Sequence, residues 1–170
     1  MEAIFYESAH LVLRQFNVND ASFVFKLLNS PTWIQFIGDR GIYHEDEALN
    51  YLIDSPLKSY EINGYGPCAV ILKATGTPIG MCGLFKREYL EWPDLGFAFL
   101  PEYEGKGYAY ESCMATLAYV REKYRFGGIY AITTEENVRC IRLLERCGFV
   151  QQAIISPSGG AERLLLFFSC

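Results

Sequence analysis

The segment around Gly105, Lys106 and Gly107 has the residue types of an anion-binding site. It lies between an extended apolar stretch, DLGFAFLP, and a stretch typical of a helix, ESCMATLAYVREKY. Glycines before a helix remove the Cβ atoms that would hold a phosphate away, and the first N–H groups of the helix have no intrahelical partner. These N–H groups and the positive end of the helix dipole attract anions. The segment therefore predicts a phosphate site, with an ordinary strand-to-helix turn as the alternative.

Two common phosphate-binding motifs do not fit this segment. A dinucleotide-binding fingerprint needs a third glycine where Tyr110 stands, and it belongs in the first βαβ unit of a chain. A Walker loop needs Ser or Thr after its lysine, whereas Gly107 follows Lys106. A nucleotide-binding oxidoreductase and a P-loop enzyme are therefore disfavoured.

The elements that position this segment follow from the periodicity of the chain. We expect a strand over residues 9–15, short helices ending near Leu28 and around Trp33, and a third helix that begins at the acidic residues 45–47. After Pro56 the pattern changes to strands, which then alternate with two helices. The predicted strands cover residues 68–73, 79–85, 94–101, 127–136, 149–156 and 162–169, and the two helices cover residues 108–124 and 137–146. This order predicts one domain over residues 1–170 with a mixed α/β (α+β) sheet, rather than a doubly wound parallel one.

Composition limits the partners. The net charge of −5 disfavours a general nucleic-acid binder, which normally presents a basic face. No apolar stretch approaches the length of a membrane span. The chain does not open with cationic residues before a long apolar stretch, and its six cysteines include no C-x-x-C pair. These features predict a cytoplasmic protein with no nucleic-acid partner, no membrane partner and no metal site.

Residues 102–107, EYEGKG, within the stretch LGFAFLPEYEGKGYAYE, closely resemble motif A of the GNAT superfamily of acyl-CoA-dependent N-acetyltransferases, in its RimJ/RimL-like branch. That motif has Arg or Gln, two variable residues, Gly, a variable residue, and Gly or Ala. A second motif of the branch, Asn-x-x-Ser before an aliphatic helix and Gly-Phe, resembles residues 137–149, NVRCIRLLERCGF. The opening LVLRQFNVNDASFVFKLLN is also similar to the branch. Two letters depart from it: Glu102 replaces Arg or Gln, and Cys140 replaces Ser.

The resemblance implies the fold and the cofactor site. The fold would be a central, mostly antiparallel twisted sheet of six to seven strands flanked by about four helices. A β-bulge would part the strand over residues 96–100 from the strand over residues 129–134, forming the CoA cleft. The first of these strands would pair with the pantetheine arm, and an N–H of Phe99 or Leu100 would bind the acetyl carbonyl. Backbone N–H groups would hold the pyrophosphate of acetyl-CoA at Glu104, Gly105, Lys106, Gly107, Tyr108 and Ala109. Asn137 would hydrogen-bond the cofactor, and a plain helix N-cap is its other reading.

The implied reaction is direct transfer of an acetyl group from acetyl-CoA to a primary amine, with no metal. It needs a base for the amine and an acid for the departing thiolate. Cys140 stands where the branch has Ser and is the candidate acid, with an inert core thiol as its alternative. Glu88 is the candidate base, with a solvated surface carboxylate as its alternative. A binding or sensing module for acyl-CoA, with the same fold but little turnover, remains the alternative function.

The acceptor side is the least specified part of the sequence. Asp39 and Arg40, in IGDRG, predict a loop near the acceptor, or else a local ion pair in a turn. Trp33 and Tyr65 are candidate walls of the acceptor pocket, although core packing is the commoner fate of such rings. A protein N-terminus and a small-molecule amine both fit these features. The apolar C-terminal segment LLLFFSC leaves monomer and homodimer open.

Overall fold

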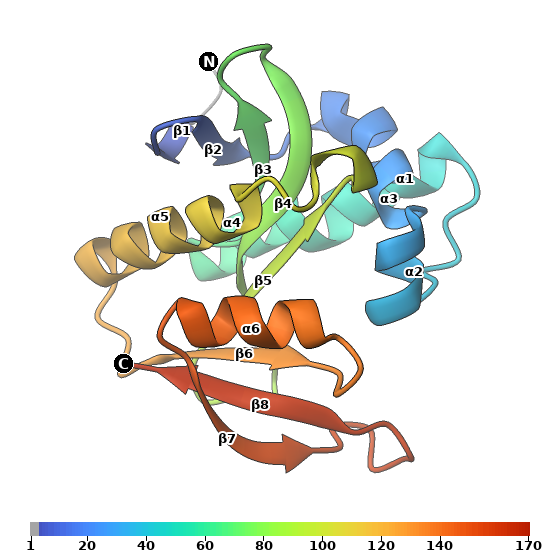
Figure 1. The fold of residues 1–170 in the computed structure, drawn as a ribbon. Coiled ribbons are helices and arrows are strands. Elements are labelled where there is room, and N and C mark those ends of the chain that lie inside the picture. Colours follow the sequence, from blue (N-terminus) through green and yellow to red (C-terminus); the bar gives the residue numbers. More distant parts are fainter. Residues whose placement is uncertain (1–3) are drawn as a thin grey trace.

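Eight strands form one open sheet in the computed structural model, which describes residues 4–170 (Figure 1). The strands are β1 (Ile4–Glu7), β2 (Leu11–Gln15), β3 (Pro67–Leu72), β4 (Thr77–Phe85), β5 (Asp94–Phe99), β6 (Ile129–Thr133), β7 (Val150–Ile155) and β8 (Leu164–Ser169). Their order is β1-β2-β3-β4-β5-β6-β8-β7. Every neighbouring pair is antiparallel except β5 and β6, which are parallel. The predicted mixed, mostly antiparallel sheet is confirmed, with one strand more than expected.

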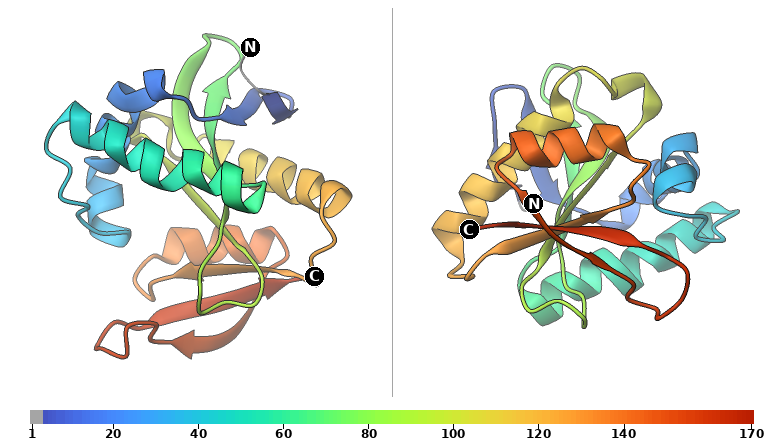
Figure 2. Two further views of the ribbon diagram at one scale, coloured as in Figure 1. Left: turned by 180° about the vertical axis from the view of Figure 1, so that it is seen from behind. Right: turned by 60° about the horizontal axis from the view of Figure 1, so that its bottom comes forward.

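Helices cover both faces of the sheet. The α-helices are α1 (Ala21–Leu28), α2 (Pro31–Phe36), α3 (Glu45–Leu52), α4 (Lys58–Asn63), α5 (Tyr108–Lys123) and α6 (Val138–Arg146). Figure 2 shows α3 and α4 on one face, with α5 and α6 on the other. The side chains agree, because α5 and α6 share one buried cluster whereas α1, α2 and α3 share a second.

Two differences from the sequence prediction have local causes. β1 is a four-residue strand at the edge of the sheet, too short to show a periodic pattern. Pro56 does not end the helical region: α3 continues through a π-helical turn, Ile53–Leu57, into α4. A π turn takes up the proline without breaking the helix, because its wider hydrogen-bond spacing removes the clash of the ring with the preceding turn.

The strands β5 and β6 meet at one residue pair. Asp94 lies opposite Tyr130, and the Tyr130 N–H donates to the carbonyl oxygen of Pro93 at 3.0 Å. Pairing of β5 with β4 is regular from Asp94 to Phe99, with no register shift. The separation of the two strands therefore comes from their divergence, and the expected bulge is not seen in the pairing of β5. Beyond Asp94, the edge of β5 that faces β6 is left open for another partner.

A buried ion pair fixes the start of α1 against the sheet. Arg14 on β2 donates to both carboxylate oxygens of Asp20, each at 2.8 Å, and the two residues are 8% and 6% exposed. Asp20 also accepts from the Asn17 N–H at 2.9 Å, in a capping box at the short 3-10 turn before α1. The carboxylate thus joins β2, the turn and the first helix.

Replacing Asp20 with alanine leaves the Arg14 guanidinium buried without that carboxylate. We expect Asp20→Ala to lower the free energy of unfolding by about 3 kcal/mol or more, measured by urea denaturation. Glu7→Ala is the control, because it removes an ion pair with Lys73 between largely exposed side chains. Its effect should stay below about 1 kcal/mol. Equal effects of the two substitutions would contradict the anchoring role of the buried pair.

Candidate active site

The loop before α5 has the backbone geometry of an anion site. Gly105 and Gly107 have φ angles of +72° and +87°, in the left-handed region that other residues rarely adopt. Gly107 is the N-cap of α5, and no side chain caps this helix end. The N–H groups of Tyr108, Ala109 and Tyr110 therefore have no intrahelical acceptor. The space beside Gly107 is open, and the nearest atom to a Cβ at Gly105 would be Nη2 of Arg139, at 3.7 Å.

Cationic side chains surround this loop. Arg139 on α6 donates to Glu104 at 3.4 Å, and the Lys106 ammonium lies 5.6 Å from the Tyr103 ring centre. The Arg146 guanidinium lies 3.8 Å from the ring centre of Tyr110 in the first turn of α5. Side chains from α6 and from the loop thus bring positive charge to the helix N-terminus, where a phosphate would gain from it.

Glu102, the unusual letter of the motif, is paired with a cation. Lys26 on α1 donates to its carboxylate at 2.7 Å, and this hydrogen bond lowers the pKa of Glu102. The acidic residue therefore does not present an unpaired negative charge to the neighbouring loop. Arg139 likewise forms an ion pair with Glu104, two residues further on.

The start of α6 carries Asn137 and Cys140. The Asn137 side chain accepts a hydrogen bond from the Cys140 N–H at 3.2 Å, so its N-cap reading is confirmed. The Cys140 side chain is partly buried against the larger core cluster. Burial raises the pKa of this thiol, and a hydrogen bond with Thr133 only partly opposes the rise. Cys140 therefore stays protonated at neutral pH.

The open edge of β5 presents a specific set of N–H groups. Leu100 donates its N–H to the carbonyl oxygen of Ile79 at 3.0 Å, on the side of β4. Because N–H groups alternate between the two sides of a strand, those of Phe97 and Phe99 point toward β6. The Leu100 N–H is thus unavailable to an acetyl carbonyl, whereas that of Phe99 remains a candidate.

Sequence reasoning missed Asp94, the residue at the point where β5 and β6 part. Asp94 is 1% exposed and accepts from the Arg87 Nε at 2.9 Å through Oδ1. Its other oxygen, Oδ2, is buried with no hydrogen-bond partner among the described residues. Burial raises the pKa of Asp94, and the Arg87 charge opposes the rise. A signal was present, because this aspartate opens the otherwise uncharged strand DLGFAFLP.

A cavity of about 400 Å³ has Tyr130 in its lining. We call it the Tyr130 cavity, after the residue that is also the register partner of Asp94. Figure 2 (left) shows the β4–β5 loop crossing in front of β6 and β8, with α6 behind them. The cavity thus lies on the sheet face away from α6. It is lined by Tyr89, Leu90, Glu91, Tyr130, Ile155, Ser156, Pro157 and Leu166.

Comparison with known proteins assigns the family. The family model described as an acetyltransferase (GNAT) domain matches residues 10–150. The chain belongs to the GNAT acetyltransferase family. It is thus an acyl-CoA-dependent acetyltransferase, of a family whose general reaction is acetyl transfer to an amine. Motif A and the second motif predicted this family, and the prediction is confirmed.

Individual relatives agree with this assignment. The uncharacterized N-acetyltransferase YnaD of Bacillus subtilis (strain 168) is 25% identical over 138 residues, which are 81% of this chain and 78% of YnaD. A structure of RimL, the ribosomal L7/L12 α-N-protein acetyltransferase, in complex with coenzyme A disulfide-bonded to a cysteine, has a TM-score of 0.81 and 13% identity over 98% of this chain and 97% of its own. A chimera of Vibrio cholerae spermidine N-acetyltransferase SpeG with hSSAT has a TM-score of 0.76 and 21% identity over 94% and 95%. The likeness of these two structures to the chain extends to the fold.

The GNAT fold does not bring all predicted acceptor residues together. Trp33 is 5% exposed within the cluster of α1 and α3, and Asp39 accepts from the Gly41 N–H at 2.8 Å in a local turn. Arg40 lies near Tyr51 on α3, because its charge opposes the rise in the pKa of Tyr51 that burial causes. Glu88 is exposed and does not line the Tyr130 cavity.

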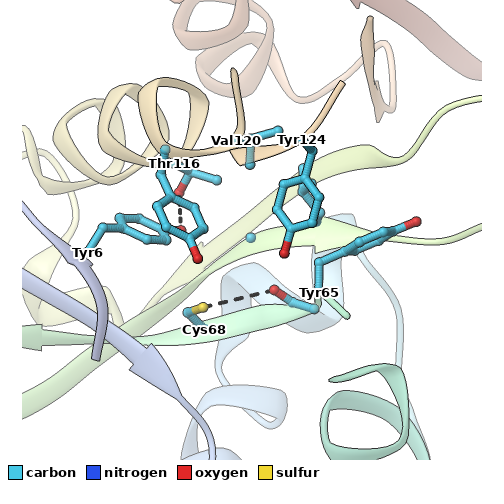
Figure 3. Close-up of a pocket in the computed structure, with 10 residues that line it drawn as sticks. Tyr6, Tyr65, Cys68, Thr116, Val120 and Tyr124 are labelled. Atoms are coloured by element: carbon cyan, nitrogen blue, oxygen red, sulfur yellow. Dashed lines mark hydrogen bonds between the residues drawn. The ribbon is translucent and has the colours of Figure 1, made fainter. Parts of the chain in front are cut away.

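Tyr65 belongs to a separate aromatic cluster. Its ring makes edge contacts with Tyr124 at 5.8 Å and Phe126 at 5.6 Å. Figure 3 shows Tyr65 and Tyr124 facing a small pocket with Tyr6, beside the C-terminal half of α5. Burial raises the pKa of Tyr65, and the charges of Tyr124 and Asp94 add to the rise, so Tyr65 lies within electrostatic reach of Asp94. Its place in the wall of an acceptor pocket stays a prediction.

Residues 4–170 contain neither a membrane-spanning helix nor a metal-binding cluster of side chains. No helix in that part of the chain is long and apolar enough to cross a membrane. Within the same residues, no group of three or more His, Cys, Asp or Glu side chains is arranged to hold a metal ion.

The raised pKa of Cys140 makes its thiol a slow nucleophile. Cys170 is exposed, whereas burial and the shifted pKa keep Cys140 largely in the unreactive thiol form. Under limiting iodoacetamide near neutral pH, we expect peptide mass spectrometry to find Cys170 modified well before Cys140. Faster modification of Cys140, in wild type or in Cys170→Ser, would contradict this assignment.

Proposed function

We propose that the chain is an N-acetyltransferase that moves an acetyl group from acetyl-CoA directly to a primary amine. The observation that carries the proposal is the uncapped N-terminus of α5, set at the end of a strand whose outer edge is open. A phosphate and a peptide-like arm on one ligand match these two features.

The residues present fit the cofactor. The N–H groups of residues 104–109 are proposed to bind the pyrophosphate, with Lys106 and Arg139 adding charge. The Phe97 and Phe99 N–H groups are proposed to pair with the pantetheine amides, which directs the thioester along β5 toward Asp94. Bound acetyl-CoA supplies the thioester that the amine attacks. Asn137 supports the site by capping α6, and a direct contact with the cofactor stays a prediction.

Asp94 is proposed as the base in place of Glu88. It lies on the sheet face of the Tyr130 cavity, and its raised pKa suits the removal of a proton from an ammonium group. Arg87 holds Oδ1, which leaves Oδ2 to receive that proton. A buried carboxylate with a free oxygen supports turnover over the alternative of an acyl-CoA-sensing module. Cys140 is proposed to lie near the departing thiolate, which needs only a weak acid.

Bulky residues in the loop should abolish CoA binding. In Gly105→Val and Gly107→Val, a β-branched residue meets a left-handed backbone, so the loop must move and its N–H groups turn away. We expect CoA affinity to fall at least about tenfold, measured by isothermal titration calorimetry.

The matched control is Gly76→Val, in the β3–β4 turn. Gly76 has a φ of +68° and open space around it, so the backbone strain is similar. The control should bind CoA as wild type does, and the melting temperatures of all three variants should be close. Unchanged CoA affinity in the folded loop variants would rule out the pyrophosphate site.

Removing the Asp94 carboxylate should slow the reaction without weakening cofactor binding. Asp94→Asn keeps an oxygen for the Arg87 hydrogen bond but loses the base. We expect kcat to fall about 10²- to 10⁴-fold, with CoA affinity unchanged. Because burial raises the pKa of Asp94, the wild-type rate should rise with pH as this carboxyl ionises, at a pH above the usual aspartate range. This limb of the profile should vanish in Asp94→Asn.

Asp54→Asn is the control, since Asp54 is an exposed aspartate in the π turn. It should keep the wild-type rate and pH profile. An Asp94→Asn enzyme that keeps both would show that the base is another group.

A further inference from the structure

We propose that Cys113 and Cys147 form a redox-sensitive dithiol, which a hydroperoxide converts into a disulfide between α5 and the end of α6. Both thiols are free, and neither takes part in the proposed acetyl transfer. The disulfide goes beyond that function, and only its effect on CoA binding rests on it. Three features carry the proposal: the contact between the two thiols, the different environments of the two sulfurs, and the position of α6 beside the anion-binding loop.

Three cysteines from separate elements meet in the larger core cluster. Cys82 on β4 and Cys113 on α5 are fully buried, whereas Cys147, which follows the last residue of α6, is 6% exposed. The Cys113 thiol hydrogen-bonds with Cys147 on one side and with Cys82 on the other. Cys113 is therefore the central thiol of the three, and Cys147 is the one with an edge to solvent.

The packing of α6 on α5 brings Cys113 and Cys147 together. Arg146, the neighbour of Cys147, stacks on the Tyr110 ring, with its guanidinium carbon 3.8 Å from the ring centre. Tyr110 and Cys113 are three positions apart on α5, so they lie on the same face of that helix. The Cys147 N–H donates to the carbonyl oxygen of Leu143 at 2.9 Å, which fixes the backbone at the end of α6. Two adjacent residues of α6 thus meet two residues on one face of α5.

The two sulfurs have the complementary environments that disulfide formation needs. The hydrogen bond with Cys113 and the charge of Arg146 lower the pKa of Cys147, although burial opposes them. Burial raises the pKa of Cys113, so this residue stays a thiol and acts as the hydrogen-bond donor. Because the thiolate is the form that attacks a peroxide, Cys147 reacts first and Cys113 follows.

The oxidation balances in two steps. The Cys147 thiolate attacks one oxygen of the hydroperoxide: an S–O bond forms, the O–O bond breaks, and the other oxygen takes up a proton and leaves as water or an alcohol. The Cys113 sulfur then attacks the sulfenic sulfur, so an S–S bond forms, the S–O bond breaks, and the hydroxyl leaves as water with the Cys113 proton. The peroxide is reduced by two electrons, and the two thiols are oxidised. A dithiol such as dithiothreitol reverses the reaction by exchange.

The disulfide acts on the cofactor site through the first turn of α5. An S–S bond is about 2.05 Å long, much shorter than a contact between two thiols, so the end of α6 moves toward α5 when it forms. Arg146 already stacks on Tyr110 at 3.8 Å, so this approach displaces the ring and the turn that carries it. The N–H groups of that turn are the proposed phosphate ligands. Oxidation therefore weakens CoA binding, and reduction restores it.

Peptide mass spectrometry after treatment with hydrogen peroxide tests the pairing. Trypsin places the cysteines of the core and of α6 in different peptides: Cys113 in residues 107–121, Cys147 in 147–163, Cys82 in 74–86 and Cys140 in 140–142. The background is Cys170→Ser, which prevents disulfide dimers through the exposed terminal thiol. We expect the first two peptides to be joined, with the loss of two hydrogens, and to separate with dithiothreitol. No joined peptide, or a dominant link of either peptide to another thiol, would overturn the proposal.

Calorimetry with desulfo-CoA, which has no thiol to exchange with the disulfide, tests the effect on the cofactor site. Affinity should fall at least about threefold on oxidation and recover on reduction. Cys147→Ala should show neither the joined peptide nor the fall. Cys68→Ala removes another buried thiol of the same cluster and should behave as the Cys170→Ser parent.

The outcomes separate the disulfide from the proposed function. Equal affinity of the oxidised and reduced forms, with the two peptides joined, would overturn the effect on CoA binding. A fall in affinity that persists in Cys147→Ala would overturn it as well, because another oxidised group would then be the cause. A reduced protein that does not bind desulfo-CoA would overturn the proposed function alone, since the joined peptide is measured without any cofactor.

Discussion

The divergence of β5 from β6 after one residue pair is the constraint on which the rest of the structure depends. Asp94 and Tyr130 form that pair, and no further pair continues the ladder in the described residues. Backbone N–H and C=O groups on the open edge of β5 must find water or a ligand, because an unsatisfied buried peptide group is costly. The same edge is therefore a weak point of the sheet and a template for a peptide-like arm.

The two faces of the sheet respond differently to this divergence. On the face of α5 and α6, one buried cluster crosses from β5 to β6 through Leu95, Ile129 and Phe167, so the halves stay joined. On the other face, the cluster of α1, α2 and α3 includes no residue of β6, β7 or β8. The C-terminal strands thus lack a helix on that side, and the Tyr130 cavity occupies the uncovered region. A core that crosses the gap on one face only holds the two halves together and leaves the other face of the C-terminal strands open.

The parts of this arrangement that sequence reasoning predicted are those with a local signature. Gly105 and Gly107 supply the left-handed backbone angles of the loop, so the sequence of the loop itself is enough to predict it. Asp94 is different, because its partner Arg87 lies seven positions earlier across a loop, and only the fold shows that one of its oxygens is buried and free. Trp33 was predicted as a wall of the acceptor pocket, but a large ring is equally suited to a core. In the structure it lies in the buried cluster of α1, α2 and α3. The environments of Asp94 and Trp33 are both set by contacts between segments that are distant in the sequence.

The geometry of β5 also explains why an acyl-CoA suits this site better than a nucleotide. The proposed base lies at the first residue of the strand, and the anion-binding loop follows its last residue. A strand rises about 3.3 Å per residue, so Asp94 and Phe99 are separated by roughly 17 Å. A ligand that touches both ends must be long, with phosphate at one end and its reactive group at the other. The open N–H groups of Phe97 and Phe99 lie on the part of the strand that leads from the loop toward Asp94, where such a ligand needs amide partners. A compact nucleotide could reach the loop alone and would leave both the edge and the carboxylate unused.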